Sequence, residues 1–350
     1  MSLATTDPRP GPQSLPRLQG RRRLVHFLGL LALLTVLAIC ALVIGARSIS
    51  MTSLFDSFSR FDANDPAHIV VQVIRLPRLV AALLVGAALA ASGALMQDIF
   101  RNPLADPGLM GVNAGASFAV VLSIWIFQIN DPGLFIWPAI LGAGAAGVLV
   151  YALGSAGAGT ATPVRYLLAG AATSALLFAI VRAILLASQQ TLDIYRFWVV
   201  GSLHGIRFDD IVPLLPFFGF GFAAAMIGAG RLNALTLGED TARSLGANPV
   251  LVRIWSIGAV TCLCAAAVAL AGPIAFVGLV VPHIARAVFG VNTLHVVVFG
   301  ALIGAALLIL ADIGGRIIVP YSELQAGVMV ALFGAPTFIW LIRRTRIMRQ

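Results

Sequence analysis

The sequence of 350 residues contains no lysine, and all 23 of its basic residues are arginines. A nucleotide-binding loop of the G-x-x-x-x-G-K-[ST] type needs a lysine to reach the phosphates, so this chain cannot contain one. The chain also lacks an H-E-x-x-H or C-x-x-C motif, and its three cysteines lie inside apolar stretches. We therefore expect no ATP hydrolysis, no metal site and no bound cofactor in this chain itself.

Charge is also scarce, since 11% of the residues are charged while 59% are hydrophobic and the mean hydropathy is +0.97. Soluble domains carry about a quarter charged residues, and a soluble fold of this length could not bury so much apolar surface. The net charge of +9 would suit a nucleic-acid-binding protein. The arginines, however, lie in short loops between apolar runs. These features predict an all-α polytopic membrane protein that binds no nucleic acid.

Ten apolar runs approach the length of about 20 residues that a membrane-spanning helix needs. They are Leu24–Gly45, Leu79–Phe100, Val112–Phe127, Leu134–Leu153, Tyr166–Ala187, Ile211–Ala229, Leu251–Ala271, Ile274–Phe289, Leu294–Leu310 and Ala326–Ile342. The first run is too long for a typical signal-peptide core, so we interpret it as a spanning helix. Arginines precede it and follow the last run, which places both ends in the cytoplasm. The expected organisation is a cytoplasmic tail 1–23, one transmembrane domain 24–342 and a cytoplasmic tail 343–350.

Three arginines then lie on the wrong side for the positive-inside rule. Arg75 and Arg78 directly precede the second run, and Arg316 follows the ninth. One interpretation is anchoring at the membrane surface by snorkelling. The other is a docking surface for an acidic partner outside the membrane. Asp312, one helical turn before Arg316, is expected to orient it.

The longest cytoplasmic loop contains a candidate partner contact at residues 238–249. Its segment Glu239–Leu245 predicts a short helix, because acidic residues at its start and an arginine near its end suit the helix dipole. Gly246 can cap this helix and Pro249 prevents a longer one. A plain linker is the alternative interpretation. The candidate contact residues are Gly238, Glu239, Asp240, Ala242, Arg243, Leu245 and Gly246.

Three residues are candidates for lining a path through the membrane. Arg182 lies inside an apolar run, where an ionisable side chain is a functional-site hypothesis; it could instead snorkel to the surface. Arg196 and Trp198 belong to the outer loop 188–210, and such residues suit either the membrane–water interface or the vestibule of a channel.

Four segments of the sequence resemble the permease family of ABC importers for ferric siderophores, haem and cobalamin, often called FecCD-type. They are Arg75–Arg78 running into Gly86–Gln97; Asn102–Ser117; Leu237–Pro249 followed by Gly272–His283; and Ala311–Pro320 followed by Gly334–Pro336. The resemblance extends from about Leu24 to Arg344. Ferric-enterobactin-type permeases are the members that this chain resembles most in two segments, GVNAGASFAVVL and YRFWVVGSL.

The resemblance implies ten spanning helices, two permease subunits around a central path, and two ATPase subunits that bind ATP and magnesium. It also implies a soluble substrate-binding protein, and a location in the cytoplasmic (inner) membrane of a bacterium. Arg75, Arg78 and Arg316 match arginines that pair with glutamates of the binding protein. Glu239–Gly246 matches the coupling helix that enters a cleft on the ATPase. Thr162, Pro163 and Val164 loosely match the cytoplasmic gate.

The expected function is therefore ATP-driven import of an iron-siderophore complex by alternating access, without covalent chemistry in this chain. One alternative is a haem or cobalamin importer of the same family. Another is a stand-alone secondary transporter, which would be expected to carry paired intramembrane carboxylates or a broken-helix ion site. The apolar runs contain almost no acidic residue, which disfavours this second alternative.

Overall fold

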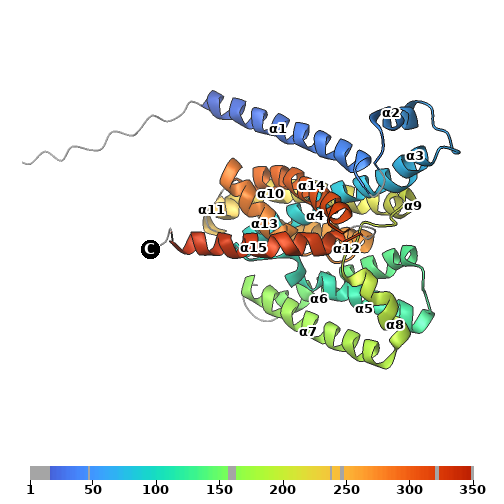
Figure 1. Cartoon of the computed structure of the whole chain (residues 1–350). Coiled ribbons are helices and arrows are strands. Elements are labelled where there is room, and N and C mark those ends of the chain that lie inside the picture. The colour runs from blue at the N-terminus through green and yellow to red at the C-terminus, as the bar shows by residue number, and fades with distance from the viewer. Residues whose placement is uncertain are drawn as a thin grey trace, which may run out of the picture.

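The computed structural model describes residues 16–45, 48–156, 163–236, 239–244, 248–319 and 323–347. Over these residues it is a helical bundle without strands, and its long helices run roughly along one axis (Figure 1). The first helix begins and the last helix ends at the same end of the bundle. We call this the termini end and the opposite end the distal end.

Ten long helices build the bundle in the described part of the chain. They are α1 (Pro16–Val43), α4 (Leu76–Ile99), α5 (Val112–Phe127), α6 (Ile136–Ser155), α7 (Pro163–Ala187), α10 (Leu215–Thr236), α12 (Pro249–Ala271), α13 (Val277–Phe289), α14 (Thr293–Ile318) and α15 (Ala326–Ile347). Each coincides with one predicted run. Seven helical segments in the described part are long and apolar enough to cross a membrane, and the apolar helices in α5, α13 and α15 are shorter.

Short helices connect these elements. They are α2 (Met51–Ser59), α3 (Pro66–Ile69), the π-helix η1 (Val70–Arg75), the 3₁₀-helices η2 (Pro107–Met110), η3 (Pro132–Phe135) and η4 (Val212–Leu214), and α8 (Gln189–Val199), α9 (Phe208–Ile211) and α11 (Glu239–Ser244). The segment 188–210, which the sequence predicts to be an outer loop, is largely helical, because α8 has its own N-cap: the Ser188 hydroxyl accepts from the Thr191 amide.

Helix α4 forms the centre of the bundle and packs against α14, α12, α13 and α10. It is rich in alanine and glycine, and most of its residues are buried. By contrast, α1 and α7 lie at the two sides of the bundle and expose most of their apolar side chains. Such outward-facing apolar surface is what a lipid environment requires.

Glycine pairs allow three pairs of neighbouring helices to approach closely. The pairs are Gly86 with Gly304 (α4 and α14), Gly93 with Gly278 (α4 and α13), and Gly115 with Gly142 (α5 and α6). At each crossing, a Cβ added to the first glycine would lie within 2.4 Å of the carbonyl oxygen of the second. Small residues at helix crossings replace the hydrophobic driving force that lipid does not supply.

Gly93→Ala should destabilise the folded chain by about 1–3 kcal/mol, because overpacking forces backbone shifts. A Cβ at Gly93 would lie 1.9 Å from the Gly278 carbonyl oxygen, so α4 and α13 would have to separate. Thermal unfolding in detergent measures the effect. Gly144→Ala is the matched control, since a Cβ there has nothing within 4 Å. Equal unfolding temperatures for the two variants would contradict the tight crossing.

Two expected boundaries are wrong, and both concern the arginines. The ninth helix was expected to end at Leu310, but α14 continues to Ile318 and includes Arg316. Likewise, η1 continues directly into α4, so Arg75 and Arg78 lie in helical segments. The helices continue because these charges have partners inside the chain, as described below.

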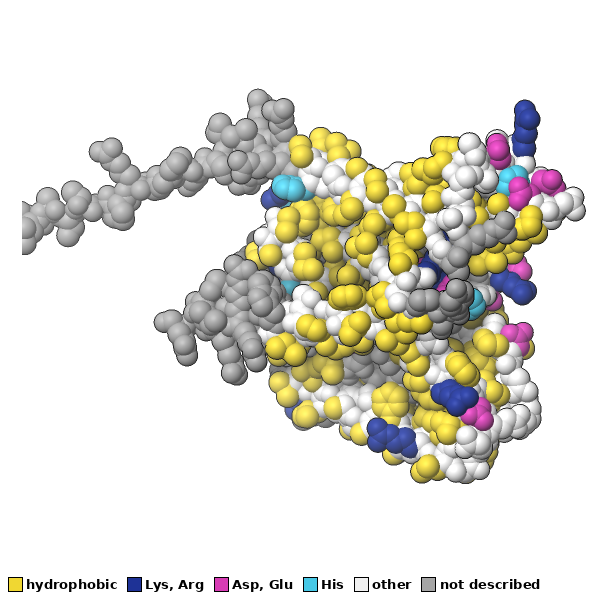
Figure 2. All heavy atoms as spheres, viewed as in Figure 1, with side chains coloured by type: hydrophobic (Ala, Val, Ile, Leu, Met, Phe, Trp, Pro, Cys, Tyr) yellow, Lys and Arg dark blue, Asp and Glu magenta, His cyan; other side chains and the backbone are white. Residues whose placement is uncertain are grey.

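Apolar and acidic side chains occupy different parts of the molecular surface. Apolar side chains cover much of the face in Figure 2, and the acidic side chains visible there gather at the distal end.

Candidate functional site

The three arginines predicted to face a partner are buried at the distal end. Arg75, Arg78 and Arg316 are 5%, 4% and 6% exposed. Their side chains are therefore buried rather than open to solvent, and a docking role for them stays a prediction. The physical reason is that each guanidinium group has acceptors within the chain itself.

Arg75 and Arg316 cap the end of α1. Arg75 Nη1 donates to the carbonyl oxygens of Leu42 at 2.6 Å and Val43 at 2.8 Å. Arg316 Nη1 donates to the carbonyl oxygens of Ala41 at 2.8 Å and Ile44 at 3.4 Å. The last carbonyls of a helix lack intrahelical partners and carry its negative dipole end. Helix α1 has no basic residue in its own last turn. Two arginines from distant segments therefore supply the charge that this helix end needs.

The Asp312 carboxylate binds both Arg78 and Arg316. Its Oδ1 accepts from Arg78 Nε and lies 2.7 Å from Arg78 Nη2, while its Oδ2 accepts from Arg316 Nη2. The Asp312 side chain is only 3% exposed. Buried charges must be paired in this way, because leaving one unpaired carries a large desolvation cost.

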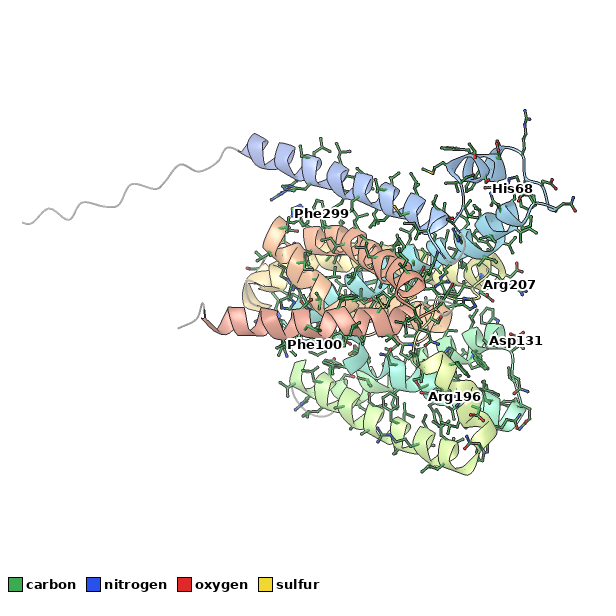
Figure 3. All side chains as sticks on the ribbon, in the orientation of Figure 1. His68, Phe100, Asp131, Arg196, Arg207 and Phe299 are labelled. Carbon is green, nitrogen blue, oxygen red and sulfur yellow. The ribbon has the colours of Figure 1, made fainter. Side chains whose placement is uncertain are left out.

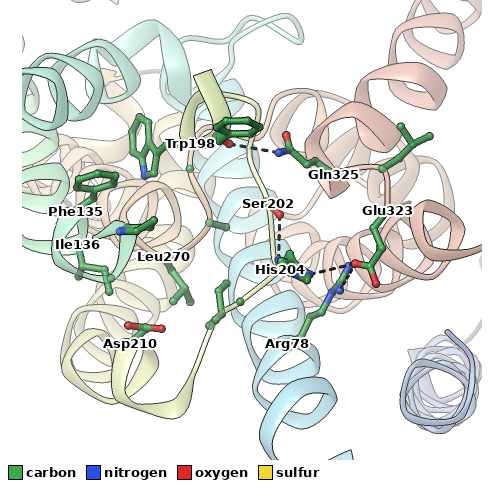
Figure 4. Close-up of a pocket in the computed structure, with 18 of the residues that line it drawn as sticks. Arg78, Phe135, Ile136, Trp198, Ser202, His204, Asp210, Leu270, Glu323 and Gln325 are labelled. Atoms are coloured by element: carbon green, nitrogen blue, oxygen red, sulfur yellow. Dashed lines mark hydrogen bonds and ion pairs between the residues drawn. The ribbon is translucent and has the colours of Figure 1, made fainter. Parts of the chain in front are cut away.

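Glu323 completes this group, and it is the most accessible member. Arg78 Nη1 donates to Glu323 Oε2 at 2.7 Å, and His204 Nδ1 lies 3.3 Å from the same oxygen (Figure 4). The Glu323 side chain is 32% exposed. Arg78 thus divides its guanidinium between a buried carboxylate and one that reaches solvent. We call Arg75, Arg78, Arg316, Asp312 and Glu323 the distal cluster.

The pKa of the Glu323 carboxyl lies below its ordinary value. Burial opposes ionisation, but the hydrogen bond from Arg78 and the positive charges of Arg78, His204 and Arg316 outweigh it. A carboxylate with a lowered pKa contributes its pairing energy above its ordinary pKa and loses it as the pH falls through the lowered value. The contact between Glu323 and Arg78 is therefore intact throughout the neutral range.

A cavity of about 940 Å³ lies beside the distal cluster. Its walls come from α8, the segment after it, the end of α12 and the segment before α15. Trp198 and Phe135 stand on one side of the cavity in Figure 4, and Arg78, His204 and Glu323 on the other. Apolar and aromatic walls with a few charged groups are typical of sites for organic ligands.

Of the three predicted path residues, one lines this cavity and two do not. Trp198 is in its wall. Arg196 projects from the exposed side of α8 (Figure 3), where its Nη1 lies 3.2 Å from the Asp193 carboxylate and its guanidinium stacks over Phe197. Arg182 is exposed on α7, away from the residues that line the cavity. A path role for Arg182 and Arg196 stays a prediction.

Glu323 and His204 are not among the residues predicted from the sequence. The sequence did carry a signal for Glu323, because Asp312 and Glu323 are the two acidic residues between the ninth and tenth apolar runs. His204 carried no such signal, because one histidine in a loop is more often a surface residue.

The predicted coupling segment contains the short helix α11 at Glu239–Ser244, at the termini end (Figure 1). It packs against α10 and α12, with Ala242 buried and Arg243 exposed. Gly238, Leu245 and Gly246 lie outside the described residues, as does Thr162 of the predicted gate. Pro163 begins α7, and Val164 is exposed in its first turn. Coupling and gating roles for these residues stay predictions.

Comparison with known proteins relates the whole bundle to transport. The family model described as the FecCD transport family matches residues 33–344. The ferric enterobactin transport system permease protein FepD of Escherichia coli (strain K12) is 42% identical over 317 residues, which cover 90% of this chain and 94% of that protein. The probable siderophore transport system permease protein YfiZ of Bacillus subtilis (strain 168) is 38% identical, covering 88% and 92%.

A solved structure shows the same fold. It is an inward-facing conformation of an ABC transporter assigned to the metal-chelate type, with a TM-score of 0.78 and 30% sequence identity, covering 90% of this chain and 97% of that one. The residues matched by the family model include the long helices from α4 to α14, parts of α1 and α15, the distal cluster and α11. This chain is a multi-pass membrane protein, and it belongs to the FecCD transport family.

Proposed function

We propose that this chain is the permease subunit of an ABC importer that moves an iron-siderophore complex across the cytoplasmic membrane by alternating access. The distal cavity carries the proposal. Its volume of about 940 Å³ is at the upper end of the range for small-molecule sites, as a bulky chelate requires. Its aromatic wall and its few polar groups suit an organic ligand.

The relatives support this substrate class. They are described as permeases for siderophores, ferric enterobactin, Fe(3+)-citrate and Fe(3+)-hydroxamate. These ligands share an iron centre wrapped by an oxygen-rich organic chelator. A permease for any of them needs a wide passage and a few polar contacts.

The energy source and partners follow from what this chain cannot do. Because it has no lysine and hence no nucleotide-binding loop, ATP and magnesium bind to two separate ATPase subunits. Helix α11 at the termini end is their contact, and the arginines near both ends of the chain support a cytoplasmic location for that end. A second permease subunit, identical or related, and a soluble substrate-binding protein at the distal end complete the assembly.

The decisive experiment is ATP hydrolysis by the reconstituted assembly. The permease, its ATPase and its binding protein are placed in vesicles, and the binding protein is loaded in turn with a catecholate, hydroxamate or citrate chelate of iron, haem or cobalamin. We expect stimulation and uptake with an iron-siderophore complex. If only haem or cobalamin stimulates ATP hydrolysis, that ligand is the substrate instead of an iron-siderophore complex. Uptake without any ATPase subunit would refute the proposal that the chain belongs to an ATP-driven importer.

Docking of the binding protein is proposed to use Arg78 by exchange of partners. Arg75 and Arg316 are occupied by backbone carbonyls of α1, and Asp312 is buried. Glu323 is the one acidic partner in the distal cluster that reaches solvent, so an incoming carboxylate can take its place on Arg78. Of the three arginines predicted to dock the binding protein, we therefore propose that Arg78 alone contacts it directly.

Glu323→Gln should strengthen docking by about ten-fold, since it removes a charged competitor worth about 1.4 kcal/mol at Arg78. Binding of the binding protein to permease in lipid nanodiscs measures the change. Asp193→Asn is the matched control, because it removes an exposed acid paired with Arg196 and should leave the affinity unchanged. Equal affinities for Glu323→Gln and the parent would rule out exchange at Arg78.

A further inference from the structure

Helix α2 stands apart from the bundle at the distal end. It covers nine residues, Met51–Ser59, and begins at Ser50, whose hydroxyl accepts from the Ser53 amide at 3.0 Å. It packs on α3 and η1 and lies beside the distal end of α1, on the outer side of the molecule (Figure 1). The transport role proposed above does not use this helix.

The side chains of α2 divide into three stripes. Because each residue rotates a helix by about 100°, positions four and then three residues apart share a face. Leu54 and Ser57 form the buried stripe against the protein. The second stripe is Met51, Phe55 and Phe58, and the third is Thr52, Asp56 and Ser59; all six are exposed.

The apolar stripe is large for a surface that none of the described residues covers. Phe55 is 70% exposed and Phe58 is 55% exposed, and Phe61 directly after the helix is also exposed. Contiguous apolar surface of this kind marks contact with another protein or with a membrane. The adjacent stripe is polar and exposed, which suits contact with water.

We propose that α2 lies in the membrane–water interface at the distal end, with its Met51, Phe55 and Phe58 stripe inserted among lipids. A short helix with separate apolar and polar faces is the arrangement that interfacial helices adopt. Its polar stripe, with Asp56, then faces water, and its buried stripe holds it to the protein.

Continuity with the lipid-facing surface favours lipid as the occupant. Helix α1 exposes apolar side chains along its length, including Leu33, Val36 and Ile39. Apolar side chains of α1 and of the α2 region appear on the same face of the molecule in Figure 2. A docking protein that binds and leaves would uncover the phenylalanines in every cycle, whereas lipid covers them continuously.

The insertion has a structural consequence for the distal cluster. Gln72 Nε2 in η1 donates to the Ser57 carbonyl oxygen of α2 at 3.2 Å. The same π-helix ends at Arg75, which caps α1. An α2 held by lipid therefore fixes the depth of Arg75 relative to the membrane surface.

The test uses single cysteines carrying an environment-sensitive fluorophore at Phe55, Phe58, Thr52 or Asp56 in the full-length permease. The chain is placed in vesicles of phosphatidylcholine and phosphatidylglycerol without any partner protein. Parent chain labelled in parallel corrects for Cys40, Cys262 and Cys264. Thr52 and Asp56 are matched controls, because each lies one residue after a position of the apolar stripe on the same helix and is also exposed.

Nitroxides attached to lipid near the headgroup should quench positions 55 and 58 at least about two-fold more strongly than positions 52 and 56. Aqueous iodide should show the reverse order. Iodide access at all four positions would overturn the proposal, as would protection of 55 and 58 that appears only when binding protein is added. Protection from both quenchers in vesicles that is lost in detergent monomers would assign the stripe to a second copy of the chain instead.

Discussion

Asp312→Ala should destabilise the permease by about 3–5 kcal/mol, which is the usual cost of removing one partner from a buried ion pair. Asp312 accepts from both Arg78 and Arg316, and its removal leaves both buried guanidinium groups without this carboxylate. Arg316 would then lose the group that aims it at the end of α1. Thermal unfolding and the yield of monodisperse protein in detergent measure the loss.

Two comparisons make this result specific. Asp193→Ala removes an acid from the exposed pair with Arg196, and it should cost no more than about 1 kcal/mol. Adding Arg316→Met to Asp312→Ala should recover part of the loss, because one of the unpaired buried charges is then removed. A cost for Asp312→Ala no greater than that for Asp193→Ala would contradict the buried network.

Replacement of Glu239–Ser244 by a glycine and serine segment of equal length should abolish ATP-driven uptake. The chain connection between α10 and α12 is kept, but α11 is lost as the proposed contact with the ATPase. A few central residues carry most of the binding energy of a protein interface, so we expect co-purification of the ATPase to fall at least about ten-fold.

Membrane insertion and docking of the binding protein should remain normal in this variant, because α11 and the distal cluster lie at opposite ends of the bundle. Arg231→Glu, an exposed change at the end of α10, serves as a control for altered charge near the same surface. Unchanged co-purification of the ATPase with the replaced segment would exclude α11 as the contact.

Sequence patterns predicted the helices well because hydropathy is a local property. Each of the ten apolar runs is a helix, including the short runs Val112–Phe127 and Ile274–Phe289. The short helix after Glu239 was also predicted, because its charges and the proline that follows lie close together in the chain. Errors occurred where a charged residue was taken to end a helix, as at Arg316.

The low charge and the ten apolar runs were sufficient to predict a polytopic membrane helix bundle. They also predicted that both termini lie at the same end. The sequence did not predict that the arginines of the distal cluster are buried and paired within the chain. Arg78 and Asp312 are 234 residues apart, and Arg316 and the Ala41 carbonyl are 275 apart. Only the tertiary structure could bring these groups together, because the burial and pairing of a charge depend on which distant segments surround it.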